Sequence, residues 1–230
     1  MFRQSCKQNR NSIYGILGLS QIGVNQVNYG NGTAFMIAPE IIVTAAHVIH
    51  QNNKHNDPLH SSIQVIRTPD IGQPFSQATL IAEDKVRDIA LLRITNPSSA
   101  DCLTLHPNRA EIGRSVGSLG FPLATVTFTN NGYTYNLVER FQGANISAFQ
   151  RSLNPATNLS LDFYETDSLM YGGSSGCPGF FETGEVFGLH VASINDKPQG
   201  ENTNSTRMAI ALWVPASDII AFASQNGIAI

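Results

Sequence analysis

The sequence predicts an all-β protein, and three observations support this class. Short apolar runs alternate with polar breaks rich in Gly, Pro and Asn, the pattern of a β-sandwich or β-barrel. The chain has 230 residues, of which 42% are hydrophobic, so it can bury a substantial core, and one all-β unit of this length is ordinary. After these runs the sequence predicts one closing helix, at 217–226, where an apolar stripe follows Ser217-Asp218 and precedes Gly227.

The candidate strands form two sets, separated by the polar segment Asn96–Glu111, which contains Pro97 and Pro107. The first set is Ser12–Gln21, Gly32–Ile37, Ile41–Ala45, Ile63–Arg67, Gln77–Ala82 and Ile89–Ile94. The second set is Ser115–Leu119, Tyr133–Phe141, Ala144–Gln150, Leu159–Glu165, Gly179–Glu182, Val186–Ser193 and Met208–Pro215. Three long polar loops are also predicted, and such loops often carry selectivity: Gln51–Ser62, Thr127–Gly132 and Asn195–Thr206.

Composition excludes several classes of partner. The formal charge is -3 with 13% charged residues, which gives no electrostatic footprint for nucleic acid or an anionic membrane. No stretch approaches the roughly 20 apolar residues that span a bilayer. The apolar run Ile13–Leu19 follows Lys7 and Arg10 as in a signal peptide, but no A-x-A-like cleavage site follows, and the run serves better as a first strand.

The three cysteines, Cys6, Cys102 and Cys177, are too few and too widely spaced for a disulfide framework. This usage favours a reducing compartment, so we expect a cytoplasmic protein, with secretion as the alternative.

Three segments carry residues with catalytic chemistry. An apolar run ends on His47, another begins after Asp88, and the turn G-x-S-G-x-P places Ser175 between Gly173 and Gly176. A serine hydroxyl needs a base within hydrogen-bond reach and a third group that orients that base. We therefore predict Ser175 as nucleophile, His47 as general base and then acid, and Asp88 as orienting carboxylate. The chain order His, Asp, Ser is that of the chymotrypsin version of the serine triad.

Each motif also has a purely structural interpretation. His47 alone could end a strand, Asp88 alone could be a turn residue, and a Gly/Ser turn is usually only a turn. The three together, in this order, favour catalysis. The backbone N–H groups of Gly173 and Ser175 are then the candidates for an oxyanion hole, because glycine lets the backbone turn its amide inward.

These residues resemble the trypsin-like serine peptidases of the chymotrypsin fold, and they look closest to the bacterial HtrA-like and glutamyl-endopeptidase-like branches. The resemblance covers about 12–222. It implies a single module, 1–230, with two six-stranded antiparallel Greek-key barrels at about 12–96 and 112–215, a linker at 97–111 and a short C-terminal helix at 217–226. His47 and Asp88 would come from the first barrel and Ser175 from the second.

The sequence departs from this family at two positions near the nucleophile. Ser174 stands where digestive trypsin-like enzymes have an Asp that pairs with a new amino terminus, so activation by that route is not expected. Cys177, two residues after Ser175, stands where a small residue is common, and it fits a buried site.

By the same resemblance, the primary specificity pocket is lined on two sides, by Leu169, Met170 and Tyr171 and by His190, Val191, Ala192 and Ser193. Leu169 stands six residues before Ser175, where a preference for Arg or Lys would need an Asp, so that preference is not expected. His190 either donates to a Glu, Gln or other polar side chain of the substrate or is a packed strand histidine. Met170 favours an aliphatic or aromatic side chain of the substrate. We predict medium-sized apolar or uncharged polar side chains, with Glu as the second choice.

The other histidines, His50, His55, His60 and His106, lie in polar segments and are expected to be solvated. No Cys/His/Asp cluster completes a metal site in the sequence pattern, so no metal or other cofactor is expected.

We therefore expect a serine endopeptidase that acts on a protein or peptide through an acyl-enzyme. A latent form, activated by a partner protein, by homo-oligomerisation or by a loop rearrangement, is a sub-case. The alternative is a catalytically silent module of the same fold that binds peptides or proteins, because fold does not fix function.

Overall fold

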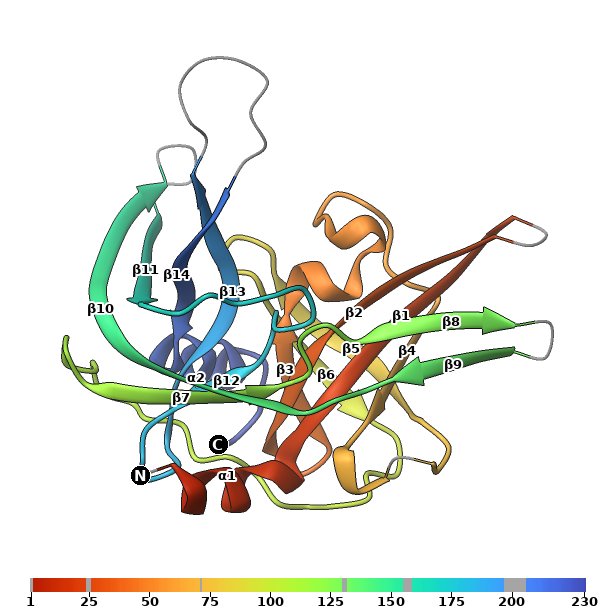
Figure 1. Ribbon diagram of the computed structural model, residues 1–230, viewed down its shortest axis with the longest axis horizontal. Helices are drawn as coiled ribbons and strands as arrows, with labels where there is room; N and C mark the ends of the chain where they lie inside the picture. Colours follow the sequence, from red (N-terminus) through yellow and green to blue (C-terminus); the bar gives the residue numbers. More distant parts are fainter. Residues whose placement is uncertain (1, 24–25, 71, 130–131, 155–158, 197–205) are drawn as a thin grey trace.

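The computed structural model describes the chain except residues 1, 24–25, 71, 130–131, 155–158 and 197–205, and it contains two closed antiparallel six-stranded barrels (Figure 1). The first barrel has the strand order β1-β2-β3-β6-β5-β4. Its strands are β1 (Ile13–Gly23), β2 (Gln26–Ala38), β3 (Ile41–Ala45), β4 (Ser62–Ile66), β5 (Ser76–Asp84) and β6 (Ile89–Ile94). β3 is buried along its whole length, which explains why its sequence is a continuous apolar run rather than an alternating one.

The second barrel has the strand order β10-β11-β14-β13-β12-β7. Its strands are β7 (Ser115–Gly120), β10 (Arg140–Asn154), β11 (Leu159–Thr166), β12 (Pro178–Phe180), β13 (Val186–Asp196) and β14 (Thr206–Pro215). The helix α2 (Ala216–Gln225) follows β14 and buries Ile219 and Ala223 in the main core. The predicted fold class, two six-stranded barrels with a C-terminal helix, is confirmed.

One hydrophobic cluster extends through both barrels, from Phe35 and Leu91 in the first to Phe180 and Val214 in the second. A second cluster fills the second barrel with aromatic rings, where Phe187 lies 5.4 Å from Trp213 and 5.6 Å from Tyr164 between ring centroids. The shared cluster fixes the barrels against each other, which a site assembled from both requires.

The sequence prediction is wrong in the segment that joins β7 to β10, two strands of the second barrel. The predicted strand Tyr133–Phe141 is divided: β9 (Gly132–Asn136) ends before β10 begins at Arg140. The predicted loop Thr127–Gly132 overlaps a hairpin of β8 (Thr125–Thr129) and β9, part of which lies outside the described residues. The loop predicted at 195–206 also lies mostly outside them.

The β8–β9 hairpin extends along the first barrel, beside β1 and β4 (Figure 1). Tyr135 donates its hydroxyl to the carbonyl of Ile16 at 3.3 Å, and Tyr133 donates to the side chain of Gln64. The ring of Phe75 lies 5.9 Å from that of Tyr135. Both strands alternate apolar or aromatic residues with polar ones, Val126 and Phe128 in β8 and Tyr133 and Tyr135 in β9, and the sequence analysis did not use this pattern for β8. The aromatic contacts stabilise the hairpin against the other barrel.

The two ends of the chain each contact the barrel that they do not belong to in sequence. The helix α1 (Arg3–Asn9), which the sequence analysis did not predict, precedes β1, yet its Asn9 side chain donates to the carbonyl of Gly184 in the second barrel at 2.9 Å. At the other end, Asp218 of α2 lies 3.9 Å from the guanidinium of Arg87 in the first barrel. A helix as short as α1 is marginal alone, so tertiary contacts of this kind stabilise it.

Candidate active site

Strand pairing brings His47 and Asp88 together. β3 and β6 are antiparallel with Ala45 opposite Ile89, so the residues after β3 and before β6 lie at one end of the barrel. The N–H of Ala46 donates to the Asp88 carbonyl at 3.1 Å, and the N–H of His47 donates to its Oδ1 at 2.8 Å. Asp88 has φ 62°, a left-handed conformation that Asp tolerates better than most residues.

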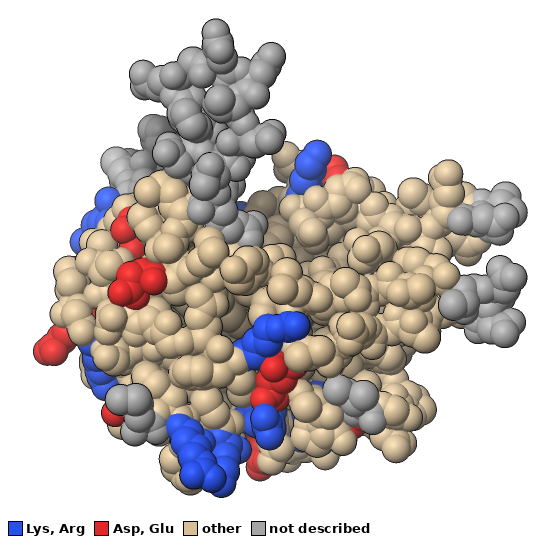
Figure 2. Space-filling view, in the orientation of Figure 1, with Lys and Arg blue, Asp and Glu red and all other residues tan. Residues whose placement is uncertain are grey.

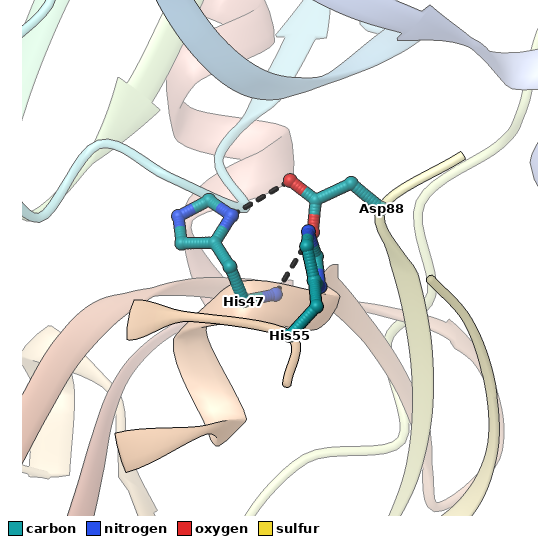
Figure 3. Close-up of side chains that lie close together, drawn as sticks. All are labelled: His47, His55 and Asp88. Atoms are coloured by element: carbon teal, nitrogen blue, oxygen red, sulfur yellow. Dashed lines mark hydrogen bonds and ion pairs between the residues drawn. The ribbon is translucent and has the colours of Figure 1, made fainter. Parts of the chain in front are cut away.

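The two side chains complete the contact: His47 Nδ1 lies 2.7 Å from Asp88 Oδ2 (Figure 3). Both side chains remain partly exposed, so solvent and substrate can reach them. In a neutral imidazole that donates from Nδ1, the other ring nitrogen, Nε2, carries the lone pair. The carboxylate therefore holds His47 in the tautomer that a general base requires.

Ser175 lies at the boundary between the barrels. Its carbonyl accepts the N–H of Thr33 from β2 at 2.8 Å, while the next residue, Gly176, donates its N–H to the His190 carbonyl of β13 at 2.8 Å. Gly176 has φ 85°, and a Cβ there would lie 2.0 Å from the Thr33 carbonyl oxygen. No residue with a side chain fits, which accounts for the glycine that follows the serine.

The turn before Ser175 is also shaped by a glycine. Gly173 has φ 91°, and a Cβ there would lie 2.5 Å from the Phe121 carbonyl oxygen. The carbonyl of Gly172 accepts the N–H of Leu123 at 2.7 Å. The C=O and N–H of a trans peptide point in opposite directions, so the N–H of Gly173 points away from Leu123. Among the described residues, no backbone carbonyl accepts the N–H of Gly173 or Ser175, and both remain available as donors.

Thr33 joins the first barrel to this turn, and the sequence analysis treated it only as part of a strand. Its buried hydroxyl donates to the Gly173 carbonyl at 2.9 Å and accepts the N–H of Phe121 at 3.1 Å. Thr44 donates to the Thr33 carbonyl at 2.7 Å. A hydroxyl residue among apolar neighbours in β2 was the one signal in the sequence that pointed to this role.

The structure brings together one side of the predicted specificity pocket. Leu169, Met170 and Tyr171 line a pocket of about 270 Å³ together with Ser118, Gly120, Pro122, Arg140, Phe141, Gln142, Ser174 and Cys177. The residues predicted for the other side, His190, Val191, Ala192 and Ser193, do not line this pocket. His190 is buried, with its ring edge-on to Trp213 at 5.1 Å. The specificity role of both sets stays a prediction.

The expectation that the remaining histidines are solvated is wrong for His50 and His60, which are buried. His50 contacts the Asp57 carbonyl at 2.6 Å and the Glu83 carboxylate at 2.7 Å. His60 lies 3.3 Å from the Ser20 hydroxyl, and burial lowers the pKa of its imidazole. Polar neighbours in the sequence hid these contacts, because the side-chain partners Ser20 and Glu83 come from the distant strands β1 and β5.

His55 and His106 are partly exposed, yet each faces a carboxylate. His55 Nε2 lies 3.4 Å from Asp88 Oδ1, and His106 Nδ1 lies 3.5 Å from the Glu185 carboxylate. The sequence analysis missed His55 as a neighbour of the candidate triad, because its loop approaches Asp88 only through the fold.

The charged surface, the cysteines and the helices also bear on expectations from the sequence. The face in Figure 2 carries few charged side chains, acidic and basic ones interspersed. Cys6, Cys102 and Cys177 are free thiols, and burial raises the pKa of the Cys177 thiol. None of the helices in the described residues has the length and apolar character needed to cross a membrane.

The family follows from comparison of the sequence with known proteins. Residues 32–189 match the family described as "Trypsin-like peptidase domain", a span that includes His47, Asp88 and Ser175. The chain belongs to this family.

Two curated relatives confirm the resemblance to HtrA-like proteins. "Serine protease HTRA2, mitochondrial" of Bos taurus is 28% identical over 187 residues, which are 78% of this chain and 35% of the relative. "Probable periplasmic serine endoprotease DegP-like" of Rickettsia prowazekii is 29% identical over 189 residues, 81% of this chain and 32% of the relative. The chain thus spans about a third of the length of these relatives. The likeness to the glutamyl-endopeptidase branch stays a prediction.

Solved structures support the fold. The active form of the Rv3671c protease from M. tuberculosis superposes with a TM-score of 0.71 at 20% identity, covering 98% of this chain and 85% of that one. An inactive form of the same protease gives a TM-score of 0.66 at 19% identity, with coverage of 97% and 92%. At this identity the likeness concerns the fold alone.

Proposed function

We propose that this protein is a serine endopeptidase that cleaves peptide bonds through an acyl-enzyme, with Ser175, His47 and Asp88 as its triad. The observation that carries the proposal is the 2.7 Å contact of His47 Nδ1 with Asp88 Oδ2, at the barrel end that the β3–β6 register creates. Membership of the trypsin-like peptidase family supports the reaction class.

In this mechanism His47 Nε2 takes the proton of the Ser175 hydroxyl as the oxygen attacks the scissile carbonyl. Asp88 stabilises the resulting imidazolium and keeps its ring in place. The protonated imidazole then donates to the leaving amine, and a water molecule repeats the sequence to release the acyl group. The N–H groups of Gly173 and Ser175 would stabilise the oxyanion, and loss of one such donor typically costs about 10²–10³ in rate.

The hydrogen bond from Leu123 to the Gly172 carbonyl supports an oxyanion turn that is already ordered, because it fixes the direction of the next peptide. Activation by a partner or by homo-oligomerisation stays a sub-case of this proposal. A titration of active sites with and without candidate partners separates an ordered enzyme from a latent one.

The proposed substrates are proteins or peptides, in keeping with the protease names of the two curated relatives. We propose medium-sized apolar or uncharged polar residues before the cleaved bond, with Glu as the second choice, rather than Arg or Lys. A cytoplasmic location is likewise a proposal. Mass spectrometry of products from a proteome-derived peptide mixture tests the preference, and cleavage mainly after Arg or Lys would contradict it.

Labelling with a serine-directed phosphonate, followed by mass spectrometry of the labelled peptide, tests the nucleophile. We expect one label on Ser175, its loss in Ser175→Ala, and its retention in Ser174→Ala, which removes the neighbouring hydroxyl. By the chymotrypsin-type example, Asp88→Asn should lower kcat by about 10⁴. Folded wild-type protein that takes no label, yet binds peptides, would favour the silent binding module instead.

A further inference from the structure

A second imidazole reaches the carboxylate of the proposed triad. His55 lies in the loop between the 3₁₀ turn Gln51–Asn53 and β4, and its Nε2 lies 3.4 Å from Asp88 Oδ1. Figure 3 shows the His47 ring at one oxygen of the Asp88 carboxylate and the His47 backbone N–H at the other oxygen, which the His55 ring also approaches. Lys85 holds the loop by donating its ammonium to the His55 carbonyl at 2.8 Å.

The three side chains form a compact set of potential metal ligands. One nitrogen from each histidine and one oxygen of Asp88 all lie within 4.8 Å of one another, and all three residues are partly exposed. Zn²⁺ binds imidazole nitrogen and carboxylate oxygen at 2.0–2.2 Å, so neighbouring ligands of a tetrahedral site are about 3.3 Å apart. His55 Nε2 lies 3.4 Å from Asp88 Oδ1, which matches this spacing. His47 Nδ1 contacts the other oxygen, Oδ2, at 2.7 Å, so the carboxylate must turn or the His47 ring must shift before both imidazoles share one oxygen with a metal ion.

The placement of His55 directs one ring nitrogen to the proposed site. Its Nε2 faces Asp88 Oδ1, whereas its Nδ1 is buried and has no hydrogen-bond partner among the described residues. The charged and titratable groups around it are His47, His50, Glu83 and Asp88, with Lys85 beyond Glu83.

We propose that His47, His55 and Asp88 bind a divalent transition-metal ion that prefers imidazole, with Zn²⁺ as the best fit, and that this ion inhibits the enzyme. Two imidazoles and one carboxylate suit Zn²⁺ better than Mg²⁺ or Ca²⁺, which prefer oxygen ligands throughout. Water would complete the four ligands. The inhibitory part rests on the proposed peptidase function, whereas the binding part does not.

Inhibition follows from the tautomer of His47. A metal on Nδ1 uses the lone pair of that nitrogen, so the single proton of the neutral ring moves to Nε2. His47 then presents an N–H rather than a lone pair to Ser175 and cannot accept the serine proton. The ion also takes Asp88 away from its orienting contact. Bound metal and an active triad are therefore mutually exclusive.

Calorimetric titration of the whole chain with Zn²⁺, and separately with Mg²⁺, tests the binding. We expect one Zn²⁺ site in the wild type, no Mg²⁺ binding at the same concentrations, and at least tenfold weaker Zn²⁺ binding in His55→Gln. His106→Gln is the matched control, because it removes a partly exposed histidine that faces a different carboxylate, and it should bind Zn²⁺ like the wild type. Thermal melts establish that both variants are folded.

Equal Zn²⁺ affinity in the wild type and in folded His55→Gln, or no binding at millimolar Zn²⁺, would overturn the site. Phosphonate labelling with and without Zn²⁺, and after a chelator, tests inhibition: we expect His55-dependent, reversible loss of labelling. Labelling that persists at saturating Zn²⁺ would overturn the inhibitory role. Absence of labelling in metal-free protein would instead contradict the proposed function, while the calorimetry still decides the site.

Discussion

Replacement of Thr33 by Val tests how the first barrel supports the turn before Ser175. The two side chains have nearly the same shape, so the change removes the hydroxyl and little else. That hydroxyl is fully buried and makes two hydrogen bonds, at 2.9 Å to the Gly173 carbonyl and at 3.1 Å from the Phe121 N–H. Valine leaves one acceptor and one donor unpaired in the interior.

Each buried polar group without a partner costs about 1–3 kcal/mol, so the two groups that Thr33→Val leaves unpaired should lower the free energy of unfolding by about 2–6 kcal/mol. For a domain of this size 1 kcal/mol corresponds to roughly 2–4 °C, and the Tm should fall by about 4–24 °C. Thr33→Ser keeps the hydroxyl and loses one methyl group, which costs only about 1 kcal/mol. Thermal unfolding followed by circular dichroism compares the two variants.

The proposed oxyanion turn should respond as well. Gly173 loses the hydroxyl that holds its carbonyl, so phosphonate labelling of Thr33→Val should be slower than that of Thr33→Ser at a temperature where both are folded. If Thr33→Val melts within 2 °C of Thr33→Ser and labels at the same rate, the hydroxyl does not support the turn and the reasoning is refuted.

Two further predictions concern a second glycine of the turn around Ser175 and a separate ion pair. Gly176→Ala places a Cβ 2.0 Å from the Thr33 carbonyl oxygen at φ 85°, so we expect its free energy of unfolding in urea to fall by more than about 3 kcal/mol. The control Gly113→Ala, at φ 87° in open space, should lose only about 1 kcal/mol. Equal losses would show that backbone strain, and not the clash with Thr33, sets the cost at Gly176. The Arg67 guanidinium, 2.8 Å away, lowers the pKa of Asp70, so this pair should stabilise the protein above the unfolded-state pKa of about 3.9 and stop doing so as pH falls through the folded-state pKa. Melting curves of wild type and Asp70→Asn should therefore differ near neutral pH and converge in acid; a constant difference would contradict this origin.

Much of the fold could be predicted because the buried strands appear in the sequence as short apolar runs. β3 and β6 begin and end at the predicted residues, since their continuous apolar runs are bounded by polar turns. The positions of His47 and Asp88 at the ends of these runs also made their meeting predictable, because antiparallel pairing brings those ends together. Local sequence was sufficient wherever the barrel's own core determined the structure.

Prediction failed where a segment depends on a distant partner. The helix α1 is stabilised by contacts with the second barrel, which leave no local period. The β8–β9 hairpin contacts the first barrel, and its alternating residues in β8 were assigned in part to a loop. The same holds for His50, His55 and His60, whose polar neighbours in the chain suggested solvent but whose partners lie on other strands or in other loops. The role of Thr33 was hidden because its two partners lie 88 and 140 residues away.

The crossed ends of the chain bear on how the candidate site keeps its spacing. Asn9 precedes the first barrel yet is fastened to Gly184 in the second, while Asp218 follows the second barrel yet faces Arg87, the residue next to Asp88. Each barrel is therefore contacted by the end of the chain next to the other barrel, and separating the two barrels would break both contacts. His47 belongs to the first barrel and Ser175 to the second, so these two non-covalent contacts oppose a change in the spacing of the residues proposed as base and nucleophile.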